Sequence, residues 1–411
     1  MSAIYKAVVI GGGAAGLLCL NELLSGKDSL DSRRVLLLEK NDRVGKKLAS
    51  TGNGRGNLFN SSMTERFYHG NKSFVSAYIK NYRELNPEGY FENIGIPLAE
   101  ENGKIYPSSF QANSVVDILR ARLSYLGAQI SFGDEVLSVK KAGDKYVIRT
   151  NNNEYFSENV VFAFGGSAGR QFGTDGSAYS LVKSLGHTVT ALYPSLVQLK
   201  TDTEYIKGLK GLKEDAKLTV TVNGKVLGES EGELLFTEYG VSGNAVFAVS
   251  PYAVSEKNAI LRAAFLPNVS AEKISEILEY RSTLGYINYN DLFTGVINKR
   301  IGMAILKRTG ADSLYDKKET RSVAINKIVK TLKDFKLKIT GSLGFDYAQV
   351  TRGGVFTEEI EPDTYKSKIN AGVYIVGEAL DVDGDCGGYN LAFAFVSGIV
   401  AAKNIKTCAQ A

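Results

Sequence analysis

The chain has 411 residues, of which 44% are hydrophobic and 23% are charged, with a formal net charge of +5. Its 43 glycines, 7 prolines and three cysteines without paired spacing exclude a proline-rich disordered protein, a disulfide framework and a four-cysteine zinc site. No basic segment with an apolar run opens the chain, and we find no 18-residue apolar run. We therefore expect a cytoplasmic protein of two or three domains, with no membrane partner and no metal site.

The first 60 residues predict a βαβ unit followed by a polar loop. Tyr5–Ile10 is short, apolar and β-branched, which indicates a buried strand. Helical spacing of leucines follows over 14–25, and Arg34–Leu38 predicts a second buried strand. This order favours a parallel sheet with a right-handed crossover. Residues 41–60 are small and polar without a period, which is typical of functional loops.

The remaining elements predict a sheet that is interrupted by an insert. We expect helices at 72–85 and 113–126, and strands at 128–132, 135–140, 145–150 and 155–163. After residue 194 the βαβ order is lost: Asn223-Gly224 predicts a hairpin, and helices are expected at 243–254, 271–281, 298–308 and 320–335. The chain ends with a strand at 372–376, a glycine loop at 377–388 and an apolar helix near 390–405. Both ends therefore build one domain.

The first glycine cluster, Gly11-Gly-Gly-Ala-Ala-Gly16, follows the first strand and opens the first helix. In this motif the glycines permit a tight turn, close approach to a pyrophosphate and close helix–strand packing, and the helix N-terminus offers amide donors. Glu39 ends the second strand 28 residues after Gly11, where a carboxylate accepts from ribose hydroxyls and repels a 2′-phosphate. The motif predicts a dinucleotide site and leaves NAD and FAD open.

Three more glycine clusters follow strand ends or loops, at Gly52–Asn57, Phe164–Ser167 and Gly377–Asn390. A nicotinamide enzyme needs one such site for its dinucleotide. A longer cofactor that lies extended through a domain needs backbone contact at several places. FAD therefore explains the four clusters better than NAD does.

The sequence resembles a bacterial family of NAD(P)/FAD-dependent oxidoreductases that includes aminoacetone oxidase-type flavoproteins. The resemblance is carried by Glu39-Lys40, Val44–Leu48, Gly52–Asn57, Phe164–Ser167, Asp175–Tyr179, Gly232–Thr237, Gly240–Gly243, Gln349–Val355 and the segment from Gly377 through Asn390. In the second loop Thr51, Asn53 and Gly56 replace the serine, glycine and cysteine of the family pattern. We therefore transfer no role from the family's cysteine.

The resemblance implies an α/β fold: a discontinuous Rossmann-like FAD-binding domain at 1–193 and 341–411, with an inserted substrate or cap domain at 194–340. The insert is expected to be β-barrel-like over 194–266 and helical over 267–340. The resemblance also implies a set of FAD-binding residues that runs from the adenosine ribose at Glu39 to the flavin. This set is Gly11, Gly13, Ala14, Ala15, Gly16, Glu39, Lys40, Lys47, Thr51, Gly52, Gly54, Asn57, Val136, Gly165, Gly166, Gly377, Glu378, Asp385, Gly387, Gly388, Tyr389, Asn390 and Leu391.

Several side chains have two interpretations each. Arg55 holds a substrate anion or braces its loop, and Tyr389 lines a substrate pocket or packs. Lys47, like Lys46, neutralises the FAD diphosphate or lies in solvent. Cys386 is interpreted as a small loop residue, because no second cysteine is near for a disulfide relay. His69 and His187 make a poor metal pair, and no residue is assigned as catalytic.

The sequence leaves three functions open. The first is an FAD-dependent oxidoreductase that transfers hydride between flavin and a small organic substrate, with NAD(P)H as a transient co-substrate. The second is a flavin amine oxidase that acts on an aminoacetone-like substrate and passes electrons to O₂. The third is a flavin-dependent RNA-modifying or nucleic-acid-binding protein, because residues 299–338 hold 12 Lys/Arg against 4 Asp/Glu. We interpret that segment as a solvated face and do not expect nucleic acid as the partner. The oligomeric state stays open.

Overall fold

The computed structural model describes residues 4–410 and divides the chain into two compact units. Unit 1 is Met1–Tyr193 with Gln349–Ala411, and unit 2 is Pro194–Ala348. Both ends of the chain thus build one unit, and the insert ends a few residues beyond the predicted boundary at 340.

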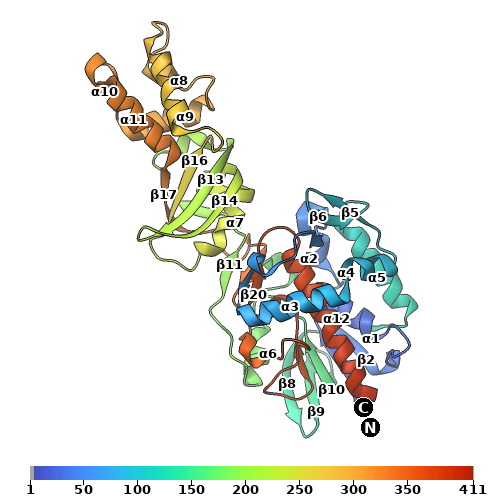
Figure 1. Ribbon diagram of the computed structural model, residues 1–411. Helices are drawn as coiled ribbons and strands as arrows, with labels where there is room; N and C mark the ends of the chain where they lie inside the picture. The colour runs from blue at the N-terminus through green and yellow to red at the C-terminus, as the bar shows by residue number, and fades with distance from the viewer. Residues whose placement is uncertain (1–3, 411) are drawn as a thin grey trace. The chain divides into compact units, whose positions relative to one another are not determined.

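Unit 1 is organised around a sheet with strand order β7-β2-β1-β10-β9-β8, and β19 pairs with β10 (Figure 1). The parallel strands are β7 (Gln129–Phe132), β2 (Val35–Glu39), β1 (Ile4–Ile10), β10 (Glu154–Phe162) and β19 (Val373–Ile375). β8 (Val136–Ala142) and β9 (Lys145–Thr150) complete the antiparallel meander with β10. The central strands carry buried apolar runs, Ala7–Ile10 in β1, Val35–Leu38 in β2 and Val160–Phe162 in β10, because helices and loops bury both faces of a parallel sheet there.

The first and last helices of unit 1, α1 (Ala14–Leu23) and α12 (Tyr389–Gln410), pack closely together. A Cβ on Gly398 of α12 would lie 2.3 Å from the Ala15 carbonyl oxygen, so the two backbones meet there. By length and composition α12 could cross a membrane, but 67% of its most apolar window is buried inside the structure. We interpret α12 as a core helix.

Shorter elements of unit 1 carry the loops between these helices and the sheet. The helices are α2 (Lys46–Ala49), α3 (Lys72–Leu85), α4 (Pro87–Asn93), α5 (Ala112–Tyr125) and α6 (Tyr179–Ser184). A small sheet joins β3 (Phe59–Asn60), β6 (Lys104–Pro107) and β5 (Leu98–Glu101), and another joins β4 (Tyr68–Gly70) to β20 (Val382–Gly384). β18 (Val350–Arg352) lies near the start of Gln349–Ala411, the second part of unit 1.

Unit 2 contains a closed barrel in the order β12-β15-β14-β13-β16-β17. Its strands are β12 (Leu199–Thr201), β13 (Lys213–Val222), β14 (Lys225–Phe236), β15 (Gly240–Ser242), β16 (Ile260–Phe265) and β17 (Phe335–Ser342). The hairpin between β13 and β14 turns at Asn223-Gly224, as predicted. The prediction that 267–340 is helical is wrong for its last residues, because β17 pairs with both β16 and β12 and closes the barrel.

The helices of unit 2 are α7 (Asn244–Val249), α8 (Ala271–Thr283), α9 (Lys299–Thr309), α10 (Asp312–Tyr315) and α11 (Arg321–Lys333). α8 to α11 gather at one end of the barrel (Figure 1). Several cations of the basic segment make internal contacts. Lys333 Nζ donates to three carbonyls between Phe265 and Val269, and the Arg308 guanidinium lies over the rings of Tyr205 and Phe335. Part of the positive charge is therefore structural.

Candidate functional site

The turn from β1 into α1 presents free backbone donors. Gly13 is the N-cap of α1, and no side chain caps it. The first four N–H groups of a helix have no partner within the helix, so this end can bind an anion. A Cβ on Gly13 would meet no heavy atom of the described residues within 4 Å. The backbone at Gly13 is therefore open to a ligand, as a pyrophosphate requires.

The other two glycines of the motif are required by the protein itself. A Cβ on Gly16 would lie 1.9 Å from the Gly11 carbonyl oxygen. Gly11 has φ +105°, and its Cβ would lie 2.6 Å from the carbonyl oxygen of Ala163 in the neighbouring loop. These contacts let the β1 end, the α1 start and the β10 end approach closely.

Glu39 is buried at the end of β2, with 6% of its surface exposed, and its carboxylate faces this turn. Oε2 accepts from Gly12 N at 2.7 Å, and Oε1 accepts from Asn41 N at 2.8 Å and from Asn41 Nδ2 at 2.7 Å. A carboxylate offers about four lone-pair sites, so capacity for another donor remains. Sequence reasoning missed Asn41, which lies two residues beyond the acidic residue it orients.

Two further predicted residues lie around Glu39. The Glu39 carbonyl accepts from Asp134 N at 3.1 Å, which places the segment leading into Val136 beside it. Lys40 Nζ lies 3.7 Å from Asp175 Oδ1. Lys40 is thus oriented toward a carboxylate of unit 1.

Lys47 and Glu378 form an ion pair, with Lys47 Nζ 2.6 Å from Glu378 Oε2. Lys47 also donates to the Ala168 carbonyl at 3.0 Å. The lysine that sequence reasoning offered as a diphosphate counter-ion is therefore occupied in this structure. Lys46, its neighbour, pairs with Asp42 at 2.6 Å.

The Gly165–Ala168 loop is held by a threonine that sequence reasoning did not single out. Thr351 Oγ1, on β18, accepts from Ser167 N at 2.7 Å and from Ala168 N at 3.0 Å. Glu378 Oε1 in turn accepts from Thr351 N at 2.8 Å. A Cβ on Gly166 would lie 2.3 Å from Thr351 Oγ1 and 2.8 Å from Glu378 Oε1, so Gly166 leaves room for both.

The Gly52–Asn57 loop contacts the Gly377–Asn390 loop through the side-chain amide of Asn57. Thr51–Gly54 is a distorted 3₁₀ turn in which Gly52 has φ +57° and Asn53 has φ +55°. The Asn57 amide, oriented to satisfy its neighbours, accepts from Gly388 N at 3.2 Å and donates to Phe59 O at 3.0 Å. A Cβ on Gly54 would meet no described heavy atom within 4 Å. The structure thus brings together two loops that lie about 330 residues apart.

The last loop leads into α12. Asn60 Nδ2 donates to Gly387 O at 3.0 Å. The Asn390 amide accepts from Gly384 N at 2.8 Å and donates to Gly384 O at 2.7 Å, which fixes the turn before the helix. Leu391 follows within the first turn of α12. A Cβ on Gly377 would lie 3.0 Å from Ala15 Cβ of α1 and 3.7 Å from Ala394 Cβ of α12.

The two candidate substrate residues both have partners within unit 1. Arg55 pairs with Glu101, and its guanidinium lies 4.5 Å from the Tyr106 ring centroid. This arrangement favours the bracing interpretation of Arg55. The Tyr389 ring stacks on Phe67 at 4.6 Å, and burial raises the pKa of its hydroxyl to about 12, so it is neutral at pH 7.

The histidines lie in separate places. His69 Nε2 lies 3.0 Å from Asp385 Oδ1, where β4 pairs with β20. His187 is buried, with Nδ1 3.0 Å from Glu359 Oε2 and Nε2 3.0 Å from Ser367 Oγ. Burial lowers the pKa of the His187 imidazole. Cys386 is exposed and Cys19 is buried in α1.

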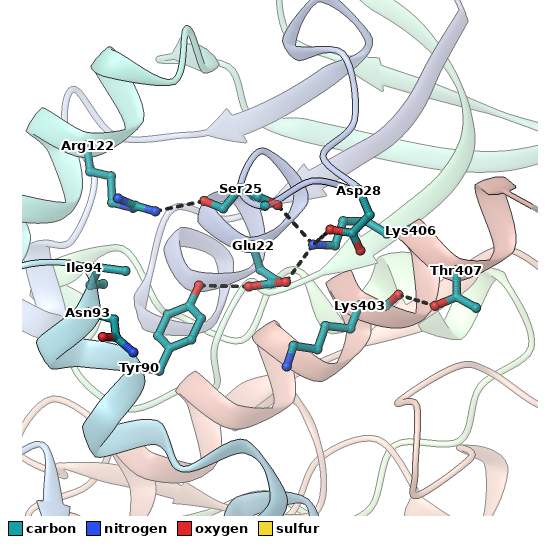
Figure 2. A pocket seen from close by; sticks show the side chains of 11 residues that line it. Glu22, Ser25, Asp28, Tyr90, Asn93, Ile94, Arg122, Lys403, Lys406 and Thr407 are labelled. Carbon is teal, nitrogen blue, oxygen red and sulfur yellow. Dashed lines mark hydrogen bonds and ion pairs between the residues drawn. The ribbon is translucent and has the colours of Figure 1, made fainter.

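A pocket of about 490 Å³ lies beside the C-terminal end of α1, opposite the end that begins at Gly13. Figure 2 shows the side chains that line it, among them Glu22 and Lys406. Its wall contains Lys406, whose Nζ lies 2.7 Å from Glu22 Oε1 and 3.1 Å from Asp28 Oδ1. Tyr90 donates to the other oxygen of Glu22 at 3.1 Å. These polar groups satisfy one another, and the glycine clusters do not contribute to this pocket.

Known proteins resemble this chain over nearly its whole length. The HI0933-like protein Rossmann domain model matches residues 5–404. The 3-dehydro-bile acid delta(4,6)-reductase of Clostridium scindens is 33% identical over 401 residues, covering 96% of this chain and 97% of that protein. The ribosomal RNA dihydrouridine synthase of Haemophilus influenzae is 26% identical over 417 residues, covering 99% and 100%.

Among solved structures, 3-ketosteroid-Δ4-(5α)-dehydrogenase from Rhodococcus jostii matches with a TM-score of 0.51 at 12% identity, covering 99% of this chain and 98% of that one. This likeness concerns the fold. The open glycine turn and Glu39 fit FAD, and FAD is the cofactor of this oxidoreductase. The resemblance inferred from the motifs is confirmed: the chain belongs to the HI0933-like Rossmann family of FAD-binding oxidoreductases.

Proposed function

We propose that this flavoprotein reduces a carbon–carbon double bond conjugated to a carbonyl group in an apolar, steroid-like small molecule, with electrons from NAD(P)H. The observation that carries the proposal is the 33% identity, over almost the full length, to a 3-dehydro-bile acid delta(4,6)-reductase. Bound FAD supplies hydride chemistry, and the protein supplies binding, orientation and exclusion of water.

The names of the two kinds of relative share one reaction class. A 3-oxo-Δ4,6 steroid and the uracil ring both contain a C=C bond conjugated to a carbonyl. In each reduction one carbon receives a hydride and its neighbour receives a proton. This shared chemistry supports a conjugated-bond reductase more strongly than it supports an amine oxidase.

The binding residues proposed for FAD follow the contacts described above. Free amides of Gly13 to Gly16 bind the pyrophosphate, and Glu39 binds the adenosine ribose. The Gly52–Asn57, Gly165–Gly166 and Gly377–Asn390 loops follow the cofactor toward the flavin. The support for this path is that hydrogen bonds join these loops to one another inside one unit.

The test is anaerobic and follows the visible flavin band. NADH or NADPH should bleach the bound flavin, and a 3-oxo-Δ4 or Δ4,6 steroid should restore the colour. The saturated 3-oxo steroid is the matched control and should leave the flavin reduced. Bleaching by aminoacetone, with peroxide formed in air, would instead support the amine oxidase and overturn the proposal.

A second candidate is reduction of uridine in ribosomal RNA. It is favoured by two relatives, from Haemophilus influenzae and Escherichia coli, that carry this name at 26% and 27% identity. Exposed lysines on α11, among them Lys327 and Lys330, offer phosphate contacts. RNA affinity measured across a salt series tests this candidate, with a Lys327→Gln/Lys330→Gln variant as the matched comparison. A steep salt slope that the variant reduces would support it.

A further inference from the structure

We propose that Thr351 is a positioning residue of the flavin site, which sets the Gly165–Ala168 loop through its hydroxyl oxygen. The proposal relies on this loop lying along FAD, as inferred above. It concerns a residue that is neither a glycine nor charged and that is not among the FAD-binding residues expected from the sequence.

The first observation is the double acceptance at Thr351. Its Oγ1 takes N–H bonds from two consecutive residues, Ser167 at 2.7 Å and Ala168 at 3.0 Å, and Thr351 is 1% exposed. Water therefore has no access to replace this acceptor. Buried N–H groups that lose their acceptor carry the full cost of desolvation, so the loop is held in the conformation that keeps both bonds.

The second observation is the support behind Thr351. Glu378 Oε1 accepts from Thr351 N at 2.8 Å, and its Oε2 is bound by Lys47 Nζ at 2.6 Å. Lys47 Nζ also donates to the carbonyl of Ala168 in the Gly165–Ala168 loop, at 3.0 Å. The four segments, from α2, the β10 loop, β18 and the 377–379 turn, thus form a closed ring of hydrogen bonds.

The third observation is the space around Gly166. Because Gly166 has no Cβ, Thr351 Oγ1 and Glu378 Oε1 can lie directly against the loop. A loop clamped in this way cannot drift toward or away from the cofactor. Hydride transfer needs reacting atoms about 3–3.5 Å apart, so a displacement of a fraction of that distance lowers the rate.

The experiment compares two replacements of Thr351. Thr351→Val keeps the shape and removes the acceptor, whereas Thr351→Ser keeps the acceptor and removes a methyl group. Thr357→Val is the matched control, because Thr357 is a buried threonine of the same unit outside this ring. Each variant is measured for thermal unfolding, for the FAD dissociation constant of the apoprotein, and for the rate of flavin reduction by NAD(P)H.

For Thr351→Val we expect the FAD dissociation constant to rise about tenfold and the reduction rate to fall about tenfold, as loss of an acceptor shared by two buried N–H groups predicts. Thr351→Ser should restore both values, and Thr357→Val should change thermal stability alone. If Thr351→Val lowers the melting temperature but leaves both flavin readouts at the wild-type values, Thr351 is a packing residue and the proposal is wrong.

If Thr351→Val does not fold, Thr351→Cys provides the comparison, since its sulfur is a weak acceptor of similar size. Wild-type FAD affinity in that variant would likewise overturn the proposal. The FAD dissociation constant uses neither NAD(P)H nor the organic substrate. Failure of the proposed reductase activity therefore leaves this readout intact, and failure of this test leaves the substrate assignment intact.

Discussion

Two glycine loops of unit 1, Gly11–Gly16 and Gly165–Ala168, use glycine for different purposes. At Gly13 the position of the missing Cβ is open, and the amides that follow are not capped by a side chain. At Gly166 that position is filled by Thr351 and Glu378, and the amides that follow are bound to Thr351. Gly13 therefore leaves space for a ligand, whereas Gly166 leaves space for the protein groups that support its loop. A glycine motif alone does not separate these two purposes.

The largest expected effect is at Gly16. Its alanine variant places Cβ 1.9 Å from the Gly11 carbonyl oxygen, which is backbone and cannot rotate away. We expect Gly16→Ala to lower the free energy of unfolding of the apoprotein by about 3 kcal/mol or more, as overpacking between backbones does. Urea denaturation measures it. Apoprotein stability equal to that of wild type would mean that β1 and α1 are farther apart than described.

The second-largest effect is expected at Gly166, where Thr351 and Glu378 occupy the space of the missing Cβ. We expect Gly166→Ala to lower the free energy of unfolding by about 2 kcal/mol, because Cβ meets Thr351 Oγ1 and Glu378 Oε1. In a double-mutant cycle, Thr351→Ala should relieve part of this clash and give a coupling energy of at least about 0.5 kcal/mol. Strict additivity of the two changes would contradict the contact.

Much of unit 1 could be predicted because its signals are local. β1, α1 and β2 follow from apolar periods, and the Gly11–Gly16 turn follows from its place between strand and helix. The segment expected to be helical, 267–340, includes most of β17, although Phe335–Ser342 alternates buried and exposed residues. The alternation was the signal that could have identified it.

The support of the site could not be predicted, because its partners are distant in sequence. Thr351 bonds an amide 184 residues away, and Lys47 pairs with a carboxylate 331 residues away. A single threonine in a strand has no local pattern that announces such a bond. Only the folded chain shows that Lys47 pairs with Glu378, while no side chain caps the first amides of α1.

A smaller effect distinguishes the open position at Gly13. Because its Cβ would meet no described atom, Gly13→Ala should leave the apoprotein within about 1 kcal/mol of wild-type stability. The added methyl group occupies the space through which the pyrophosphate approaches, so we expect the FAD dissociation constant to rise about tenfold, or about 1.4 kcal/mol. Flavin fluorescence titration of the apoprotein measures it. Unchanged FAD affinity would remove Gly13 from the cofactor's path.

The smallest expected effect concerns Lys47, and it tests whether the charge of this lysine contributes to FAD binding. If Lys47 faced the diphosphate, Lys47→Met would weaken the dependence of FAD affinity on salt, because one cation would be lost from the site. Lys47 instead lies 2.6 Å from Glu378 Oε2, so this carboxylate already pairs with its charge. We therefore expect the slope of FAD affinity against salt concentration to be the same in Lys47→Met and wild type, with Lys46→Met as the control. A shallower slope in Lys47→Met alone would show that Lys47 leaves Glu378 and contacts the cofactor. The Gly165–Ala168 loop, through Lys47, would then share the electrostatic role of the Gly11–Gly16 loop.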